Sequence, residues 1–281
     1  MYDTAGSLPD GVLEAMAYLS RSENRIRILR ALSQCQMEPR ELTERTDIPR
    51  STARRILTEM NERGWVERTL DGEYVATPSG ELMTAETEQY LESIRAVQSL
   101  ESAVSWLPED ELTIGIHHFG DARVIGHRTN DAVAPDTYAI ERIRESNEFR
   151  NLTNIAPTLG FERALHDGVK AGTLSSEHVV TPGVLPELRM NDERQRRWQE
   201  YLTAGADLYL YEGDIRCNLF IMDDTVFIAD SQLESLEYIE VDDQTVLSWA
   251  HHVIDSFRQD ADQLSADSFA ANSGSPPDNH L

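Results

Sequence analysis

The sequence has few cysteines and no long apolar run. Cys35 and Cys217 are far apart in the chain, so we expect no structural disulfide and interpret both as small buried hydrophobic residues. No stretch of roughly eighteen apolar residues occurs, and the N-terminus lacks a basic segment followed by an apolar one. We therefore expect a cytoplasmic protein with no membrane partner.

Lysine is almost absent, because Lys170 is the only one among 25 basic residues, against 50 acidic residues and a net charge of −25. Residues 1–80 hold 11 Arg and 13 Asp plus Glu, a net charge of −2, whereas residues 81–281 hold 14 basic and 37 acidic residues, a net charge of −23. Abundant Asp and Glu with almost no Lys resembles proteins of salt-accumulating archaea, in which extreme charge is a known adaptation. We interpret the composition as halophilic.

Residues 38–77 have the pattern of two short helices followed by a β-hairpin. In the second helix, four apolar residues recur at helical spacing and predict a buried stripe. These residues are Ala53, Ile56, Leu57 and Met60. Pro49 disfavours a helical conformation at the residue before it, so this helix begins at Arg50 or Ser51, and the Ser51 hydroxyl is available to cap it.

The exposed face of this second helix begins with a cluster of arginines and hydroxyl residues. Its members in the first turn and a half are Arg50, Ser51, Thr52, Arg54 and Arg55. Arginine offers a planar fork of donors to guanine or phosphate, and recognition helices commonly meet DNA at their start. We therefore predict that these residues bind double-stranded DNA.

Gly64 ends the helix, and two β-prone segments follow at 65–68 and 74–76 with an Asp-Gly turn between them. Asp-Gly between two such segments predicts a hairpin. We assign Arg68, Gly72 and Tyr74 in this hairpin to DNA binding as well.

The segments RILRALSQ and ELTERTDIPRSTARRILTEMNERGWVER, with the hairpin after them, resemble the winged helix-turn-helix domain of archaeal transcriptional regulators of the TrmB, ArsR and MarR types. The resemblance covers about a third of the chain and implies DNA as the ligand. The alternative is a winged helix that makes protein contacts alone. Arginines at the start of the helix, with Glu59 and Glu62 at its end, favour DNA.

Residues 81–105 predict one long helix within a linker of residues 81–107. A heptad-like apolar seam runs along it. The seam consists of Met83, Tyr90, Ile94, Val97 and Val104. We favour pairing of this helix across the two-fold axis of a homodimer; the alternative is packing on its own C-terminal domain.

Short apolar runs alternate with helices over residues 108–264, which predicts an α/β domain. They include a strand at LTIGIHHF (112–119), a helix over 136–149, and a hairpin turning at residues 223–224. Residues 265–281 are rich in Ser, Ala, Asp, Asn and Pro and predict a disordered tail. The fold class is therefore α+β, with a winged helix-turn-helix in residues 1–80, the linker helix, and an α/β sensor-like domain.

Three segments of this second domain resemble the C-terminal sensor domains of TrmB-type regulators, some of which are related to the phospholipase D fold. These segments are EHVVTPGVLPEL, NLFIMDDTVFIADS and TVLSWAHHVIDSFRQDA. The resemblance implies a small-molecule effector. Phospholipase D chemistry needs a His two residues before a Lys, and Gly168 occupies that place before Lys170, so this route of hydrolysis is excluded.

Thr181 and Gly183 are the candidate ligand contacts, because the chain there passes from a predicted strand into a helix whose N-terminus offers free N–H groups. Adjacent histidines at 117–118 and at 251–252 diverge from each other, so neither pair alone chelates a metal. The alternative is a site formed by one histidine from each pair, but no Cys or carboxylate stands beside them at metal-ligand spacing, and we predict no metal and no cofactor. We interpret the arginines within 194–197 as a solvated helical face rather than an anion site.

Neither a Gly-x-Ser-x-Gly motif nor a P-loop occurs, so we expect no enzymatic activity. The function predicted is a sequence-specific DNA-binding transcriptional regulator, a homodimer whose C-terminal domain senses an effector or mediates assembly. The alternative is a winged-helix protein-interaction module that does not bind DNA.

Overall fold

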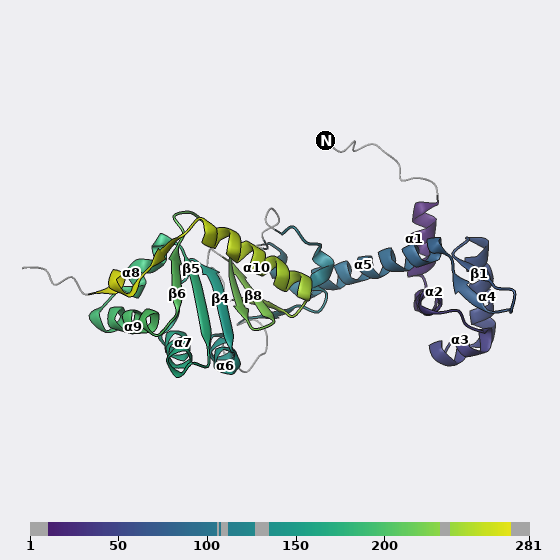
Figure 1. Cartoon of the computed structure of the whole chain (residues 1–281). Coiled ribbons are helices and arrows are strands. Elements are labelled where there is room, and N and C mark those ends of the chain that lie inside the picture. The colour runs from purple at the N-terminus through teal and green to yellow at the C-terminus, as the bar shows by residue number, and fades with distance from the viewer. Residues whose placement is uncertain (1–10, 106, 108–111, 127–134, 231–236, 271–281) are drawn as a thin grey trace, which may run out of the picture. The chain divides into compact units, whose positions relative to one another are not determined.

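The computed structural model describes residues 11–105, 107, 112–126, 135–230 and 237–270. The chain divides into two compact units, Met1–Leu91 and Glu92–Leu281, and the division falls within helix α5 (Pro78–Leu100) (Figure 1). Among the described residues, none of the helices combines the length and the apolar character needed to cross a membrane.

The N-terminal unit packs its helices and a hairpin around one apolar core. Its remaining elements are α1 (Val12–Ser20), α2 (Glu23–Gln34), α3 (Pro39–Thr46), α4 (Arg50–Glu62), β1 (Val66–Arg68) and β2 (Tyr74–Ala76). The predicted apolar stripe of α4 is confirmed, since all four of its residues are buried in this core. The predicted hairpin is confirmed too, with Val66 opposite Ala76 and Arg68 opposite Tyr74.

Two local predictions in this unit were wrong. Ser51 does not cap α4, because the helix already begins at Arg50 and the cap position falls on Pro49, which has no side-chain donor or acceptor. Cys35 is not buried: it follows the last residue of α2 and is exposed, with Arg45 donating to its Sγ at 3.5 Å. Cys217 is buried as predicted.

Helix α5 begins three residues earlier than predicted and ends at Leu100, where a 3₁₀ turn, η1 (Glu101–Ser105), takes over. Only the middle of the predicted apolar seam is exposed to solvent. Tyr90, Ile94 and Val97 are exposed, whereas Met83 and Val104 are half-buried against the cores of their own units. The ends of the seam are therefore already covered within the chain.

The C-terminal unit is a mixed sheet with helices on both faces. Its helical elements are η2 (Ile116–Phe119), α6 (Pro135–Glu145), α7 (Leu159–Ala171), η3 (Pro182–Val184), α8 (Leu185–Leu188), α9 (Asp192–Thr203), α10 (Gln244–Gln259) and η4 (Ala266–Phe269). Its strands are β3 (Arg123–Ile125), β4 (Glu148–Thr153), β5 (Ser175–Val180), β6 (Asp207–Leu210), β7 (Cys217–Met222), β8 (Thr225–Asp230), β9 (Tyr238–Val241) and β10 (Asp262–Leu264).

The strand order is β10-β6-β5-β4-β7-β8-β9-β3. Strands β4, β5 and β6 are parallel, and the other neighbouring pairs are antiparallel. The register places Asn151 of β4 opposite both His178 of β5 and Phe220 of β7. These three side chains therefore form a row across the middle of the sheet.

Alternate residues of each strand point to opposite faces of this sheet. Leu152, Val179 and Leu219 belong to the core on the face that α10 covers, whereas Phe149 and Val180 belong to the core beneath α7 and α9 (Figure 1). The predicted β7–β8 hairpin is confirmed, with Asp223 in its turn at φ 51°.

Three predictions for this unit were wrong. Residues 112–119 form no strand; their apolar side chains pack into the α10-side core, so burial alone accounts for the apolar run. Helix α6 ends at Glu145, and Phe149 lies in β4. The predicted tail is ordered in its first part, because Phe269 of η4 is buried and stacks on Trp198. Residues 271–281 lie outside the described residues.

Candidate nucleic-acid interface and candidate ligand cavity

The two faces of α4 differ in what they contact. The stripe at Ala53, Ile56, Leu57 and Met60 is buried in the core, which fixes the opposite face toward solvent. Arg50, Ser51, Arg54 and Arg55 on that face are exposed and Thr52 is half-buried, so the helix presents all five predicted DNA-binding residues at the surface.

The three arginines at the start of α4 are not equivalent. Arg55 donates to Glu59 at 2.7 Å, and Glu59 also forms an ion pair with Arg25. Within the described part of the chain, Arg50 and Arg54 have no ion-pair partner. These two guanidinium groups are therefore the ones available to an external anion without breaking an internal pair.

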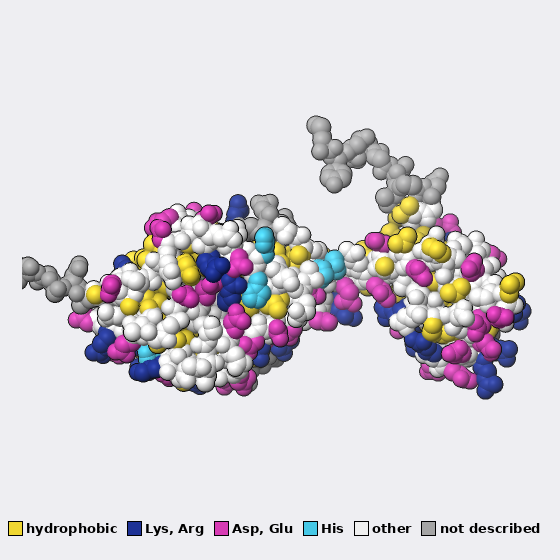
Figure 2. Space-filling model, viewed as in Figure 1, with side chains coloured by type: hydrophobic (Ala, Val, Ile, Leu, Met, Phe, Trp, Pro, Cys, Tyr) yellow, Lys and Arg dark blue, Asp and Glu magenta, His cyan; other side chains and the backbone are white. Residues whose placement is uncertain are grey.

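The hairpin adds one more cation beside α4. Arg68 at the end of β1 donates to the backbone oxygen of Gly72 at 3.2 Å, and its guanidinium lies 5.9 Å from the ring centre of Tyr74. Gly72 has φ 91°, a conformation that residues with a side chain rarely adopt. The turn thus holds the three predicted hairpin residues together. Figure 2 shows basic side chains interspersed with acidic ones over α3 and the adjoining end of α4.

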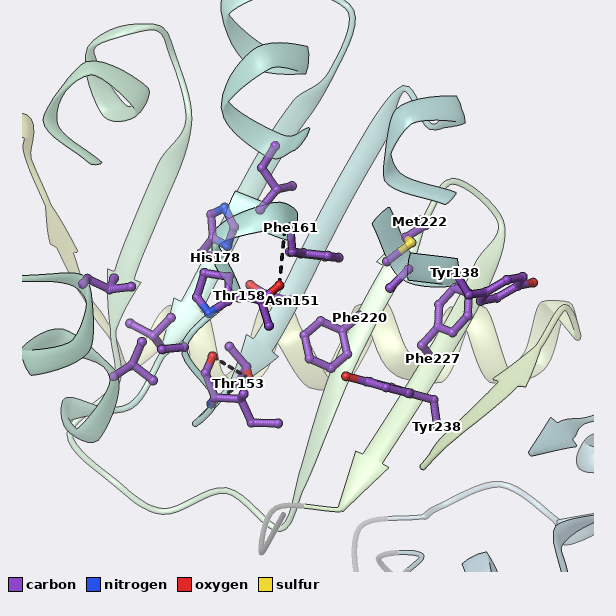
Figure 3. A pocket seen from close by; sticks show the side chains of 18 of the residues that line it. Tyr138, Asn151, Thr153, Thr158, Phe161, His178, Phe220, Met222, Phe227 and Tyr238 are labelled. Atoms are coloured by element: carbon purple, nitrogen blue, oxygen red, sulfur yellow. Dashed lines mark hydrogen bonds between the residues drawn. The ribbon is translucent and has the colours of Figure 1, made fainter. Parts of the chain in front are cut away.

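A cavity of about 190 Å³ lies on the face of the C-terminal sheet that α10 leaves uncovered. Its floor is formed by residues of six strands, among them Asn151, Thr153, His178, Phe220, Phe227 and Tyr238 (Figure 3). Its walls come from α6, α7, α8 and α9 and from residues 155–158, and include Tyr138, Phe161, Leu165, Leu188 and Trp198. Most of the lining is aliphatic or aromatic.

Several polar groups of the lining already have partners. The Thr153 hydroxyl donates to Asn218 Oδ1 at 2.8 Å, the Thr158 hydroxyl accepts from the backbone N–H of Phe161, and the Tyr138 hydroxyl donates to Glu240 at 2.6 Å. These groups are held by the protein itself and are not free to bind a guest.

Two buried polar atoms of the lining have no partner among the described residues. They are Asn151 Oδ1 and Trp198 Nε1, on side chains that are 5% and 2% exposed. An unsatisfied buried polar group costs about 1–3 kcal/mol. Among the described residues, the cavity lining therefore holds one acceptor and one donor that the protein leaves unsatisfied.

The imidazole of His178 is a buried titratable group in the cavity floor. Its Nε2 lies 2.9 Å from both the Ser176 hydroxyl and the Tyr201 hydroxyl. Complete burial lowers the pKa of the His178 imidazole to about 3 and raises that of the Tyr201 hydroxyl. Both rings are therefore uncharged at neutral pH.

The structure places the two predicted ligand residues next to this cavity but not in it. Thr181 precedes η3 and its backbone N–H donates to the Thr153 carbonyl at 3.2 Å, and Gly183 is exposed. Val180 and Val184, on either side of them, line the cavity instead. In place of the single helix expected after Thr181, the structure has a three-residue 3₁₀ turn followed by a four-residue helix. Sequence reasoning missed Asn151, because β4 mixes polar and apolar residues and the amide does not stand out among them.

The paired histidines have individual partners. His118 Nδ1 lies 3.3 Å from Asp243, and His251 Nδ1 lies 2.8 Å from Arg150. Among the described residues, no group of three or more His, Cys, Asp or Glu side chains is arranged to hold a metal ion.

Two family models match the sequence. Residues 13–99 match the HVO_A0261 N-terminal domain, and residues 133–260 match the middle domain of the methanogenesis regulatory protein FilR1. A comparison with curated proteins found no match.

Three solved structures illustrate the structural comparison. TrmBL2, an archaeal chromatin protein, is 15% identical, with 89% of this chain and 99% of that chain covered and a TM-score of 0.41. The phospholipase D family member Nuc from Salmonella typhimurium is 11% identical, with 51% and 99% covered and a TM-score of 0.41. An IclR homolog from Microbacterium sp. strain HM58-2 is 13% identical, with 86% and 96% covered and a TM-score of 0.23.

These TM-scores are too low for any of the three structures to carry an argument about this chain. The two sequence matches remain, and each falls on one side of residue 108. The chain is therefore similar to the HVO_A0261 N-terminal domain in its first part and to the middle domain of a regulatory protein in its second.

Proposed function

We propose that this protein is a sequence-specific DNA-binding transcription regulator. Its N-terminal unit binds double-stranded DNA as a winged helix, and its C-terminal unit binds a small-molecule effector. The observation that carries the proposal is the start of α4, where Arg50 and Arg54 are exposed and, among the described residues, without an ion pair. The similarity of residues 133–260 to a domain of the regulatory protein FilR1 supports a regulatory role.

In this proposal the start of α4 enters the major groove. Arg50 and Arg54 donate to guanine edges or phosphates, and Ser51 and Thr52 add hydroxyl contacts. Arg68 in the hairpin binds the flanking backbone as a positioning contact. The proposal assigns no enzymatic activity and no cofactor to the chain.

The proposal includes a homodimer. On α1, Val12 and Met16 are exposed, and with Tyr90 and Leu91 of α5 they border an open groove in the N-terminal unit. Exposed apolar patches of this kind are typical of protein interfaces. A second copy of the same chain is the simplest occupant, since a two-fold dimer carries two recognition helices to a palindromic site.

The test is selection of bound DNA in molar KCl, with a pool of promoter fragments compared with random DNA. The variant Arg50→Ala plus Arg54→Ala is compared with Arg144→Ala plus Arg196→Ala, which removes the same charge from exposed positions of α6 and α9. We expect enrichment by the wild type and the control, and a loss of about 2 kcal/mol or more, roughly 30-fold in affinity, in the α4 variant.

Equal loss in both double variants contradicts direct contact by α4. Absence of enrichment by a folded wild-type protein supports the other candidate, a winged helix that serves protein interaction alone. Measurement at several KCl concentrations gives a second criterion: a slope of log K against log salt near −5 through the molar range would mean that about six phosphate contacts dominate, against our expectation that base contacts do.

A further inference from the structure

The chemistry of the cavity restricts what it can bind. Its volume of about 190 Å³ is slightly larger than that of a cavity that takes up benzene, about 150 Å³ with an aliphatic and aromatic lining. A guest of one ring with a small substituent fits this space. A disaccharide or a nucleotide is too large to lie wholly within it.

Charge restricts the guest further. Among the described residues, the cavity lining contains no Asp, Glu, Lys or Arg, and its histidine, His178, is uncharged at neutral pH. An isolated charge placed in such surroundings costs several kcal/mol or shifts its protonation. Carboxylates, phosphates and ammonium groups are therefore disfavoured. Free sugars are disfavoured as well, because most of their hydroxyl groups would lack partners.

The amide of Asn151 supplies the polar contact. It projects from the central strand between His178 and Phe220, and Figure 3 shows it in the middle of the lining side chains. Among the described residues, Asn151 Oδ1 accepts no hydrogen bond. Trp198 Nε1, in the helical wall of the cavity, donates none to them either. A guest that donates to the Asn151 oxygen removes one unsatisfied group, and a guest that also accepts from Trp198 removes both.

We propose that this cavity binds an uncharged, mainly apolar molecule of about one aromatic ring, which bears a hydrogen-bond donor for Asn151 Oδ1. The inference deepens the regulator function proposed above, because it gives the chemical class of the effector. It concerns the C-terminal unit alone and can fail or stand independently of DNA binding.

The experiment compares four probes on the full-length protein in KCl by isothermal titration calorimetry: phenol, toluene, benzoate and glucose. We expect phenol to bind most tightly, toluene about fivefold more weakly because it lacks the donor, and benzoate and glucose not measurably. Asn151→Leu keeps the size of the side chain and removes the amide. In this variant the preference for phenol over toluene should be clearly smaller than in the wild type.

A second variant fills the space. Ala156→Phe places a ring into the cavity from the loop after β4, where Ala156 is half-buried, and should abolish binding of both phenol and toluene. Circular dichroism confirms that each variant is folded. If Ala156→Phe leaves binding unchanged, the probes bind elsewhere and the inference is overturned.

Three further results overturn it: no binding of phenol by the wild type, tighter binding of benzoate or glucose than of phenol, or a preference for phenol over toluene that is undiminished in Asn151→Leu. The DNA selection separates this outcome from failure of the regulator function. Phenol binding without DNA enrichment leaves the cavity assignment intact and refutes the regulator function. DNA enrichment without phenol binding refutes the cavity assignment and leaves the regulator function intact.

Discussion

The buried imidazole of His178 should make stability depend on pH in a window that its pKa defines. Burial lowers this pKa to about 3 in the folded protein, against about 6.5 in an unfolded chain. Between these values the unfolded state binds more protons, so the free energy of unfolding rises with pH. The stability that the protein has with a neutral His178 is fully present above pH about 6.5 and is lost as the pH falls toward 3.

The expected magnitude follows from the two pKa values. Each pH unit inside the window changes the free energy of unfolding by about 1.4 kcal/mol. Because the window opens gradually, lowering the pH from about 6 to about 4 should remove about 2–3 kcal/mol through His178 alone. Many carboxylates titrate in the same range, so the wild type must be compared with a variant that lacks the imidazole.

The variant is His178→Gln, which keeps a polar group for the Ser176 and Tyr201 hydroxyls but does not titrate. Urea unfolding at fixed KCl, measured from pH 4 to pH 7, should give a shallower pH dependence for this variant by the amount above. His252→Gln removes an exposed imidazole as the matched control. Parallel curves for the wild type and His178→Gln would refute the claim that His178 is neutral in the folded protein.

Two further predictions concern a buried ion cluster and the dimer. Glu162 is buried and accepts hydrogen bonds from two arginines of α9, so Glu162→Gln should destabilise the C-terminal unit by about 3 kcal/mol in urea unfolding; the exposed Glu193→Gln should cost less than about 1 kcal/mol, and equal costs would contradict this account. Met16→Glu on α1 should convert the dimer to a monomer in light scattering, whereas Leu159→Glu, exposed on the other unit, should not; a monomeric wild type would contradict the dimer.

The N-terminal unit was predictable because its signals are local. The position of Pro49 ends one helix region and opens the next, the apolar spacing in α4 selects its buried face, and Asp-Gly sets the hairpin. The exposure of Arg54 follows from the same spacing. The ion pair of Arg55 with Glu59 was harder to predict from the sequence. An arginine four residues before a glutamate is as compatible with a DNA-binding face as with an ion pair inside the helix.

The C-terminal unit shows what local signals leave out. We predicted a solvated helical face for the arginines at 194–197, but the side chains of Arg194 and Arg197 are mostly buried. Both form ion pairs with Glu162, which lies in α7, more than thirty residues earlier in the chain. The order of Phe269 depends on Trp198 in the same way. Neither partner can be found from a window of the sequence, since long-range packing decides each case.

Asn151 shows both the weakness of a local signal and the effect of long-range packing. A single amide in a strand is a weak signal, and pattern reasoning placed the ligand at Thr181 and Gly183, where the strand ends. The sheet register alone brings His178 and Phe220 to either side of Asn151, and the helices above close the space around it. The cavity is therefore a property of the tertiary structure, because only the strand register and the covering helices together surround the Asn151 amide with apolar side chains.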